Sequence, residues 1–229
     1  MMIRKISNWL FVIGIVLISA NIFLYLNQSN STSGALGDAE ALLGGSDNSY
    51  EEEAQDETLQ RHDDSATHTE DEFEENKPPH MINEEPPSMT KEEFEPQVNE
   101  VIGLLHIPKL DESLPIIGGV DDEQLDRGVG HLPSTVLPMD GDQILLSGHR
   151  DTVFTNFDEL EKGDNFIVEL PYGKFEYEMK ETEIVDKDDT SVIRSMDEEV
   201  LTLSTCYPFS YLGNAPERYV IYAYPVEQE

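Results

Sequence analysis

Apolar residues are distributed along the chain in three different ways, and each way predicts a different kind of segment. A nearly unbroken apolar run covers residues 9–26, a polar and acidic stretch covers 27–99, and short apolar runs fill 100–229. An apolar run of about 18 residues just spans a bilayer core as a helix, whereas short β-branched and aromatic runs bounded by turn residues are typical of strands. The pattern therefore predicts a membrane anchor, a polar connection and a β-rich domain.

The charges on either side of the apolar run predict its orientation. Arg4 and Lys5 precede the run, and acidic residues follow it. Because basic residues favour the cytoplasmic side, we expect residues 1–8 in the cytoplasm, a single span over 9–26, and the rest of the chain outside the cell membrane. A cleaved signal peptide is the alternative, but the run is long for such a peptide and no A-x-A site follows it.

The stretch over residues 27–99 has the composition of a disordered acidic stalk. It holds 20 acidic and three basic residues, and this excess of 17 is half of the net charge of −34. Few aromatic residues are present to offset the entropy of ordering, although residues 88–94 can start a short helix. Its histidines, His62, His68 and His80, lack the spacing of metal ligands, and no D-x-D-x-D-G calcium loop is present. We therefore expect no metal and no cofactor.

The last segment, residues 100–229, predicts an all-β domain with short helices. Turn residues separate about eight short strands, and such a series suggests a closed barrel. Short helical turns are expected over 121–128 and 156–162, and a loop over 128–135. The predicted strands cover residues 102–107, 114–120, 143–147, 165–170, 174–180, 181–186, 200–205 and 218–224.

The net charge and the cysteine content exclude several classes of protein. A strongly acidic chain is unsuited to nucleic acid, whose phosphates need basic partners, and to adsorption on anionic lipid. Because Cys206 is the only cysteine, the chain cannot form an intramolecular disulfide. A single thiol in an extracellular chain is either a buried small hydrophobe or a reactive group.

The surroundings of Cys206 favour reactivity. If the strands over 200–205 and 218–224 pair as a hairpin, Cys206 and Arg218 lie at the mouth of the same loop, about 5 Å apart at Cβ. A nearby cation favours the reactive thiolate, and the same guanidinium can stabilise an oxyanion. His149, which follows the strand over 143–147, is the candidate acid or base that a cysteine nucleophile requires.

Two other histidines of the domain are weaker candidates for this role. His106 lies within a predicted strand, where a structural role is expected. His131 lies in a glycine-rich loop and is the second choice as the partner of Cys206. Asp151, two residues after His149, is either a turn residue or a group that balances charge.

The sequence Thr202-Leu203-Ser204-Thr205-Cys206 resembles the TLxTC motif of sortases. His149, upstream of this motif, and Arg218, downstream of it, match the order and spacing of that family's His–Cys–Arg triad. The resemblance covers the domain over residues 100–229 and none of the acidic stretch before it. It implies a sortase-type β-barrel and an extracellular cysteine transpeptidase that uses no cofactor.

The resemblance also implies the substrates and the residues that contact them. The enzyme would cleave a secreted protein after the threonine of an LPxT(A/G) sorting signal and join it to a cell-wall amine through a thioacyl intermediate. Thr205 would help to place the substrate carbonyl, and Val192 and Ile193 would pack the leucine of the signal, although both could equally fill the barrel. The motifs LSTCYPF and PERYVIYAYP look most like class D sortases of Gram-positive bacteria.

Two alternative functions come from other classes. One is a cysteine hydrolase that releases surface proteins, and the other is an inactive surface adaptor carried on an acidic stalk. Capture of the acyl group by an added amine separates transpeptidase from hydrolase, and reaction at Cys206 separates both from the adaptor.

Overall fold

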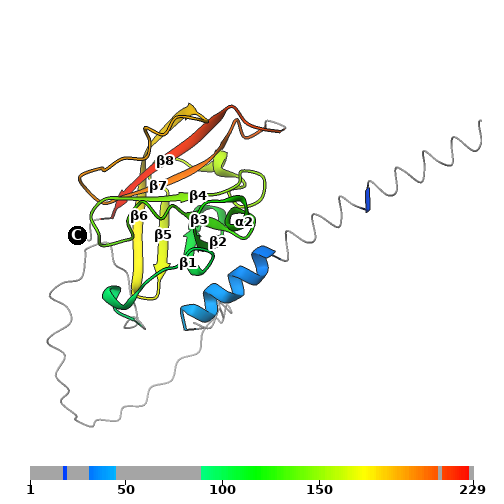
Figure 1. Ribbon diagram of the computed structural model, residues 1–229. Coiled ribbons are helices and arrows are strands. Elements are labelled where there is room, and N and C mark those ends of the chain that lie inside the picture. The colour runs from blue at the N-terminus through cyan, green and yellow to red at the C-terminus, as the bar shows by residue number, and fades with distance from the viewer. Residues whose placement is uncertain (1–17, 20–30, 45–88, 211–212, 227–229) are drawn as a thin grey trace, which may run out of the picture.

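A computed structural model describes residues 18–19, 31–44, 89–210 and 213–226. Its main feature is a closed barrel of eight strands in the order β1-β2-β3-β4-β7-β8-β6-β5, with β5 returning to β1 (Figure 1). The all-β fold and the closed eight-stranded barrel are therefore confirmed. The strands are β1 (Val101–Ile107), β2 (Glu112–Gly118), β3 (Val129–His131), β4 (Gln143–Ser147), β5 (Asn165–Leu170), β6 (Gly173–Asp186), β7 (Val200–Tyr207) and β8 (Glu217–Pro225).

The helices described from residue 89 onward are short, and they lie before the first strand or in the connections between strands. The helix α2 (Asp122–Leu125) follows the capping residue Asp121 and lies within the helical turn predicted over 121–128. Three 3-10 helices complete the set, namely η2 (Lys91–Glu93), η3 (Pro108–Leu110) and η4 (Phe157–Glu159). The helix predicted over 156–162 is thus a single 3-10 turn.

Two strand pairs are parallel and the remaining pairs are antiparallel. β2 pairs with β3, and β4 pairs with β7, in parallel. In the second pair Ser147 lies opposite Ser204. Parallel neighbours end at the same edge of a sheet, so the residues after β4 and the end of β7 lie together at one end of the barrel.

A segment predicted as a loop contains a strand, and two segments predicted as separate strands form a single strand. Residues 129–131 form β3 because their backbone pairs with β2 and β4, although flanking glycines hide this from the sequence. A Cβ at Gly130 would lie 2.4 Å from the carbonyl oxygen of Gly119, so glycine permits the close approach. The predicted strands over 174–180 and 181–186 join into β6, whose register shifts between Met179 and Glu181.

The barrel interior is filled by aromatic and branched side chains. The largest fully buried ones include Tyr177, Phe154, Phe157, Phe166 and Phe175. A second, smaller cluster packs separately from this core and includes Val192 of the β6–β7 connection; its members are Val185, Val192, Val200, Val220 and Tyr222. Burial of one such side chain contributes about 1.5–3 kcal/mol, and both clusters therefore hold the strands that carry the site.

The segment before β1 packs on the barrel. The ring of Phe94 lies 5.4 Å from that of Tyr172, Lys91 pairs with Asp140, and the Asn99 N–H donates to the carbonyl of Gly118 at 2.8 Å. Residues 91–99, which the sequence assigns to the stalk, therefore contact the folded domain. The short helix expected near residues 88–94 is present as η2.

The structure describes little of the remaining N-terminal prediction. Most of the acidic stretch lies outside the described residues, but residues 31–42 form a helix where no regular structure was expected. Alanine and leucine favour this helix, and Ala35 and Ala39, one turn apart, are buried. The anchor predicted over 9–26 lies outside the described residues except for Ile18 and Ser19, which are helical. None of the helices that the structure describes is long and apolar enough to cross a membrane.

A polar network joins neighbouring strands of the barrel. His106 Nε2 lies 2.7 Å from Glu169 Oε2, and its Nδ1 lies 2.8 Å from Ser113 Oγ. The Lys174 ammonium lies 3.1 Å from the other oxygen of Glu169. An ionised carboxylate only accepts hydrogen bonds, so Glu169 links β5 to donors on β1 and β6.

Replacing Glu169 with glutamine should lower the free energy of unfolding near pH 7 by about 1–3 kcal/mol, because a charged acceptor of two hydrogen bonds is lost. Burial raises the pKa of Glu169, but the hydrogen bonds from His106 and Lys174 outweigh it, and the pKa lies below its ordinary value of 4.5. A depressed pKa adds stability above the unfolded value, and this stability is lost as pH falls through the folded value.

Urea denaturation of wild type and Glu169→Gln across pH measures this effect. The difference between the two proteins should be complete above pH 4.5 and should shrink at lower pH. A difference that stays constant into the acid range would contradict the assigned role of the carboxylate.

Candidate active site

Cys206 and Arg218 are direct cross-strand partners. β7 and β8 pair antiparallel, and Cys206 lies opposite Arg218 at the end of the barrel, as the predicted hairpin required. The thiol is free and partly exposed. One guanidinium nitrogen of Arg218 donates to the carbonyl of Glu217 at 3.1 Å, which limits the movement of the side chain. The arrangement puts a permanent cation beside an accessible thiol.

His149 reaches the same end of the barrel from β4. The Gly148 N–H donates to the carbonyl of Ser204 at 3.1 Å and so extends the parallel pairing of β4 and β7. His149 is therefore level with Cys206 on the neighbouring strand. The N–H groups of Val153 and Phe154 donate to the His149 carbonyl at 3.0 and 2.9 Å, so a tight turn fixes the backbone that carries the imidazole.

The His149 side chain is partly exposed and has an acidic neighbour. Its Nε2 lies 3.7 Å from Oδ1 of Asp126, the residue that ends α2. No local motif in the sequence marks Asp126, because it lies on a different element from His149 and only the fold brings the two together. The carboxylate can attract an imidazolium, at a distance longer than a hydrogen bond.

Thr205 connects the two strands that carry Cys206 and His149. Its side chain is buried, and its hydroxyl donates to the carbonyl of Gly148 at 2.8 Å. The hydroxyl is thus already bonded to the backbone next to His149. Thr205 therefore joins the two catalytic candidates, in addition to any role toward a substrate.

A buried arginine that the sequence analysis missed makes a second connection. Arg150 is only 7% exposed, and its guanidinium binds both carboxylate oxygens of Asp151, at 2.8 and 2.9 Å. Its third nitrogen donates to the carbonyl of Pro208 at 2.7 Å, two residues after Cys206. The loop after His149 is therefore tied to the loop after the thiol.

Charges in this connection are balanced. The hydrogen bonds from Arg150 hold the pKa of Asp151 below its usual range, against a smaller effect of burial. The same hydrogen bonds raise the pKa of Arg150, and burial opposes this effect. Asp151 therefore balances charge, which is one of the two roles expected for it. The only signal for Arg150 in the sequence is its position directly after His149.

Val192 and Ile193 lie in the β6–β7 connection but face different surroundings. Val192 is 7% exposed and packs in the small cluster with Val200 and Tyr222, whereas Ile193 is 43% exposed. The buried side-chain amide of Gln143 donates to the Val192 carbonyl at 2.8 Å and accepts from the Arg194 N–H at 3.1 Å. The connection is thus held to β4. Of the two apolar side chains, that of Val192 is buried and that of Ile193 is exposed to solvent.

The other two histidines of the domain have structural surroundings. His131 is buried, its Nε2 lies 3.0 Å from the carbonyl of Val136, and burial lowers its pKa. His106 belongs to the polar network with Glu169. Neither lies in register with the thiol, so His149 is the histidine that the fold brings to Cys206. The residues that the structure describes include no group of three or more metal-ligating side chains.

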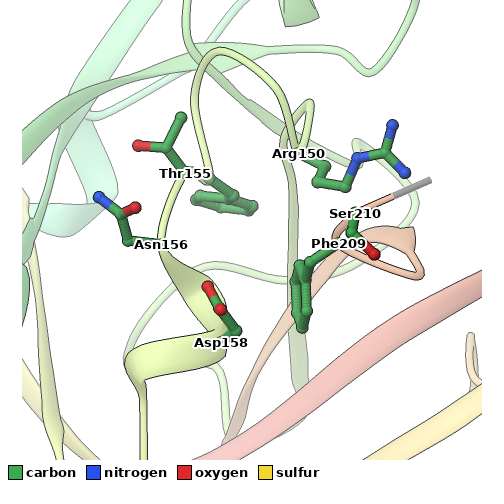
Figure 2. Close-up of a pocket in the computed structure, with 7 residues that line it drawn as sticks. Arg150, Thr155, Asn156, Asp158, Phe209 and Ser210 are labelled. Carbon is green, nitrogen blue, oxygen red and sulfur yellow. The ribbon is translucent and has the colours of Figure 1, made fainter. Parts of the chain in front are cut away.

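A cavity of about 260 Å³ lies beside this site (Figure 2). One wall is the segment after His149, and the opposite wall is the segment after Cys206. The lining residues are Arg150, Phe154, Thr155, Asn156, Asp158, Phe209 and Ser210. A thiol, an imidazole and a guanidinium at one edge, with a cavity next to them, form a site suited to nucleophilic attack on a carbonyl.

Known proteins are similar to this chain in sequence and in fold. A family model described as "Sortase domain" matches residues 105–226. The chain is 53% identical over 133 residues to "Sortase D" of Bacillus subtilis (strain 168), a match that covers 58% of this chain and 67% of the relative. It is 34% identical over 134 residues to "Sortase SrtE1" of Streptomyces coelicolor, covering 50% of this chain and 38% of that protein.

Solved structures give the same result. "Sortase C1 of GBS Pilus Island 1" superposes with a TM-score of 0.53 at 31% identity, covering 58% of this chain and 68% of the other. The Sortase D5 transpeptidase of Clostridium perfringens superposes with a TM-score of 0.52 at 27% identity, covering 58% of this chain and 82% of the other. The family model spans more than half of the 229 residues and agrees with the observed barrel and with the TLxTC resemblance. The chain therefore belongs to the sortase family, the cysteine transpeptidases that anchor proteins to the cell wall, and its similarity to Sortase D supports a place in class D.

Proposed function

We propose that this sortase cleaves secreted proteins after the threonine of an LPxT(A/G) sorting signal, with Cys206 as nucleophile, Arg218 as oxyanion donor and His149 as acid and base. The observation that carries the proposal is the register of three strands. Cys206 pairs directly with Arg218, and the parallel pairing of β4 and β7 brings His149 level with both.

The first half of the reaction forms a thioester. The Cys206 sulfur attacks the threonine carbonyl carbon, and the carbonyl electrons move to oxygen, where Arg218 donates hydrogen bonds to the oxyanion. When the C–N bond breaks, a protonated His149 gives its proton to the leaving amine. The amino-terminal part of the substrate remains bound to the sulfur.

The second half transfers the acyl group. A cell-wall amine attacks the thioester carbon, His149 takes the proton that the amine loses, and the Cys206 thiolate leaves. The new amide bond replaces the one that was cleaved, so the transfer needs no ATP. Sortases act on sorting-signal substrates and cell-wall amines, and this use of the acyl group favours transpeptidation over the hydrolase and adaptor alternatives.

The substrate contacts follow from exposure. Ile193 is exposed on a connection that Gln143 holds in place, and we assign it to the leucine of the signal. Val192 supports this surface from beneath, and Thr205 fixes the backbone at Gly148 that borders the substrate carbonyl.

The place of the enzyme in the cell is part of the same proposal. The apolar run over residues 9–26, with Arg4 and Lys5 before it and acidic residues after it, supports a single-pass protein with a cytoplasmic N-terminus and an extracellular catalytic domain. The acidic stretch would then connect the catalytic domain to the membrane anchor.

Replacing Cys206 with alanine should abolish peptide cleavage and leave the fold intact, because Cys206 is the only thiol and its loss removes the nucleophile. Mass spectrometry of an LPxTA peptide incubated with enzyme and amine, together with circular dichroism, measures both properties. Turnover near the wild-type rate in a folded Cys206→Ala protein would exclude the cysteine mechanism.

Replacing Arg218 with lysine separates two roles of the guanidinium. Lysine keeps the charge but loses the planar set of donors. If directed hydrogen bonds hold the oxyanion, turnover should fall by about 100- to 1,000-fold, while alkylation of Cys206 by iodoacetamide changes much less. A turnover within a few-fold of wild type would limit Arg218 to its charge.

An LPxTA peptide should be cleaved at least as efficiently as an LPxTG peptide, since the chain resembles class D sortases, which often prefer alanine after the threonine. The ratio of kcat/KM for the two peptides, with a scrambled peptide as control, tests this expectation. A strong preference for glycine would contradict it.

A further inference from the structure

The cavity beside Cys206 has no role in the steps assigned to the triad. Its volume of about 260 Å³ is large enough for the end of an extended side chain, and it is open beside the segment that follows Cys206 (Figure 2). Phe209 and Ser210, which follow the thiol closely in the chain, form the wall on this side. The opposite wall comes from the 3-10 helix η4 and the residues before it.

The charge in the cavity is negative. Arg150 lines it, but its charge is balanced by Asp151, and three of its five N–H groups donate to Asp151 and to the carbonyl of Pro208. Asp158 also lines the cavity, and it has no hydrogen bond or ion pair among the residues that the structure describes. Within this described lining, the carboxylate of Asp158 is therefore the one charge without a partner, because the guanidinium of Arg150 is paired with Asp151.

The remaining groups of the lining also suit a positively charged occupant. Asp158 belongs to η4 and Asn156 directly precedes this helix, whereas Phe209 lies on the opposite side of the cavity (Figure 2). The amide oxygen of Asn156 and the hydroxyl of Ser210 can accept hydrogen bonds, and the face of an aromatic ring attracts a cation. An ammonium group, which only donates hydrogen bonds, fits a cavity lined by acceptors and an aromatic ring.

We propose that this cavity receives the primary ammonium group of the acceptor substrate, with Asp158 as its counter-ion. The inference rests on the proposed thioester at Cys206. A primary amine of ordinary pKa, about 10.4, arrives protonated at neutral pH, and a carboxylate in the cavity next to the segment that follows Cys206 concentrates that form. His149 then removes one proton, the amine nitrogen attacks the thioester carbon, the Cys206 thiolate leaves, and the second proton that the nitrogen loses passes to this thiolate.

Adjacent acids on η4 provide a matched pair of variants. Both are exposed, but Asp158 lines the cavity and Glu159, the next residue, does not. Asp158→Asn and Glu159→Gln each remove one negative charge from the same turn of the full-length enzyme. Melting temperatures near that of wild type are expected for both variants, because neither carboxylate is buried.

The experiment follows the thioester formed from an LPxTA peptide and a lysine-containing acceptor at increasing concentration. For Asp158→Asn, the acceptor KM should rise about five- to tenfold, within the range for losing one charged contact. Hydrolysis of the thioester by water, and its cleavage by hydroxylamine, which is uncharged at neutral pH, should stay at the wild-type rate. Glu159→Gln should change the acceptor KM by less than about twofold.

Three outcomes would overturn the assignment. The acceptor KM could be unchanged in Asp158→Asn, it could change equally in Glu159→Gln, or the KM of the sorting peptide could change instead, which would assign the cavity to the first substrate. Failure of the proposed function is distinguishable, because the wild-type enzyme would then form no thioester in the absence of any acceptor.

Discussion

The site depends on the parallel pairing of β4 with β7. Parallel strands end at the same edge, so this one pairing brings together His149 and Cys206, which are far apart in the sequence. The antiparallel pairing of β7 with β8 then adds Arg218 opposite the thiol. If β7 slipped by one residue, Cys206 would point to the other face of the sheet. The closed barrel resists such a slip, because every strand in it has two neighbours.

Buried polar groups convert this register into a fixed arrangement of loops. The hydroxyl of Thr205 holds the carbonyl of Gly148, and the guanidinium of Arg150 holds that of Pro208. Each bond joins the chain next to His149 to the chain next to Cys206. Because an unsatisfied buried donor costs about 1–3 kcal/mol, these side chains favour one relative position of the two loops. Transition-state stabilisation requires such preorganised groups.

Two surfaces of the domain differ in character, and the difference suits a reaction with two substrates. The β6–β7 connection presents the exposed Ile193 next to an apolar cluster and is held by Gln143. The cavity instead carries hydrogen-bond acceptors and the carboxylate of Asp158, which has no partner among the described residues. An apolar signal and a charged amine can therefore approach one sulfur from surfaces of different chemistry.

The sequence by itself determined the features that rest on local pattern. The strand over 143–147, the hairpin that pairs Cys206 with Arg218 and the helical turn within 121–128 all follow from neighbouring residues, and so does the family resemblance in the TLxTC motif. The membrane anchor also rests on local pattern, and it remains a prediction because residues 9–26 lie almost wholly outside the described part of the chain.

The tertiary structure alone decided that Val192 is buried while Ile193 is exposed, that β3 is a strand, and that Arg150 joins two loops. Each of these depends on packing or hydrogen bonding between segments far apart in the sequence. Local sequence does not show whether such distant partners exist. Two adjacent apolar residues, a short run between glycines, and an arginine beside a histidine each have the same sequence in either case.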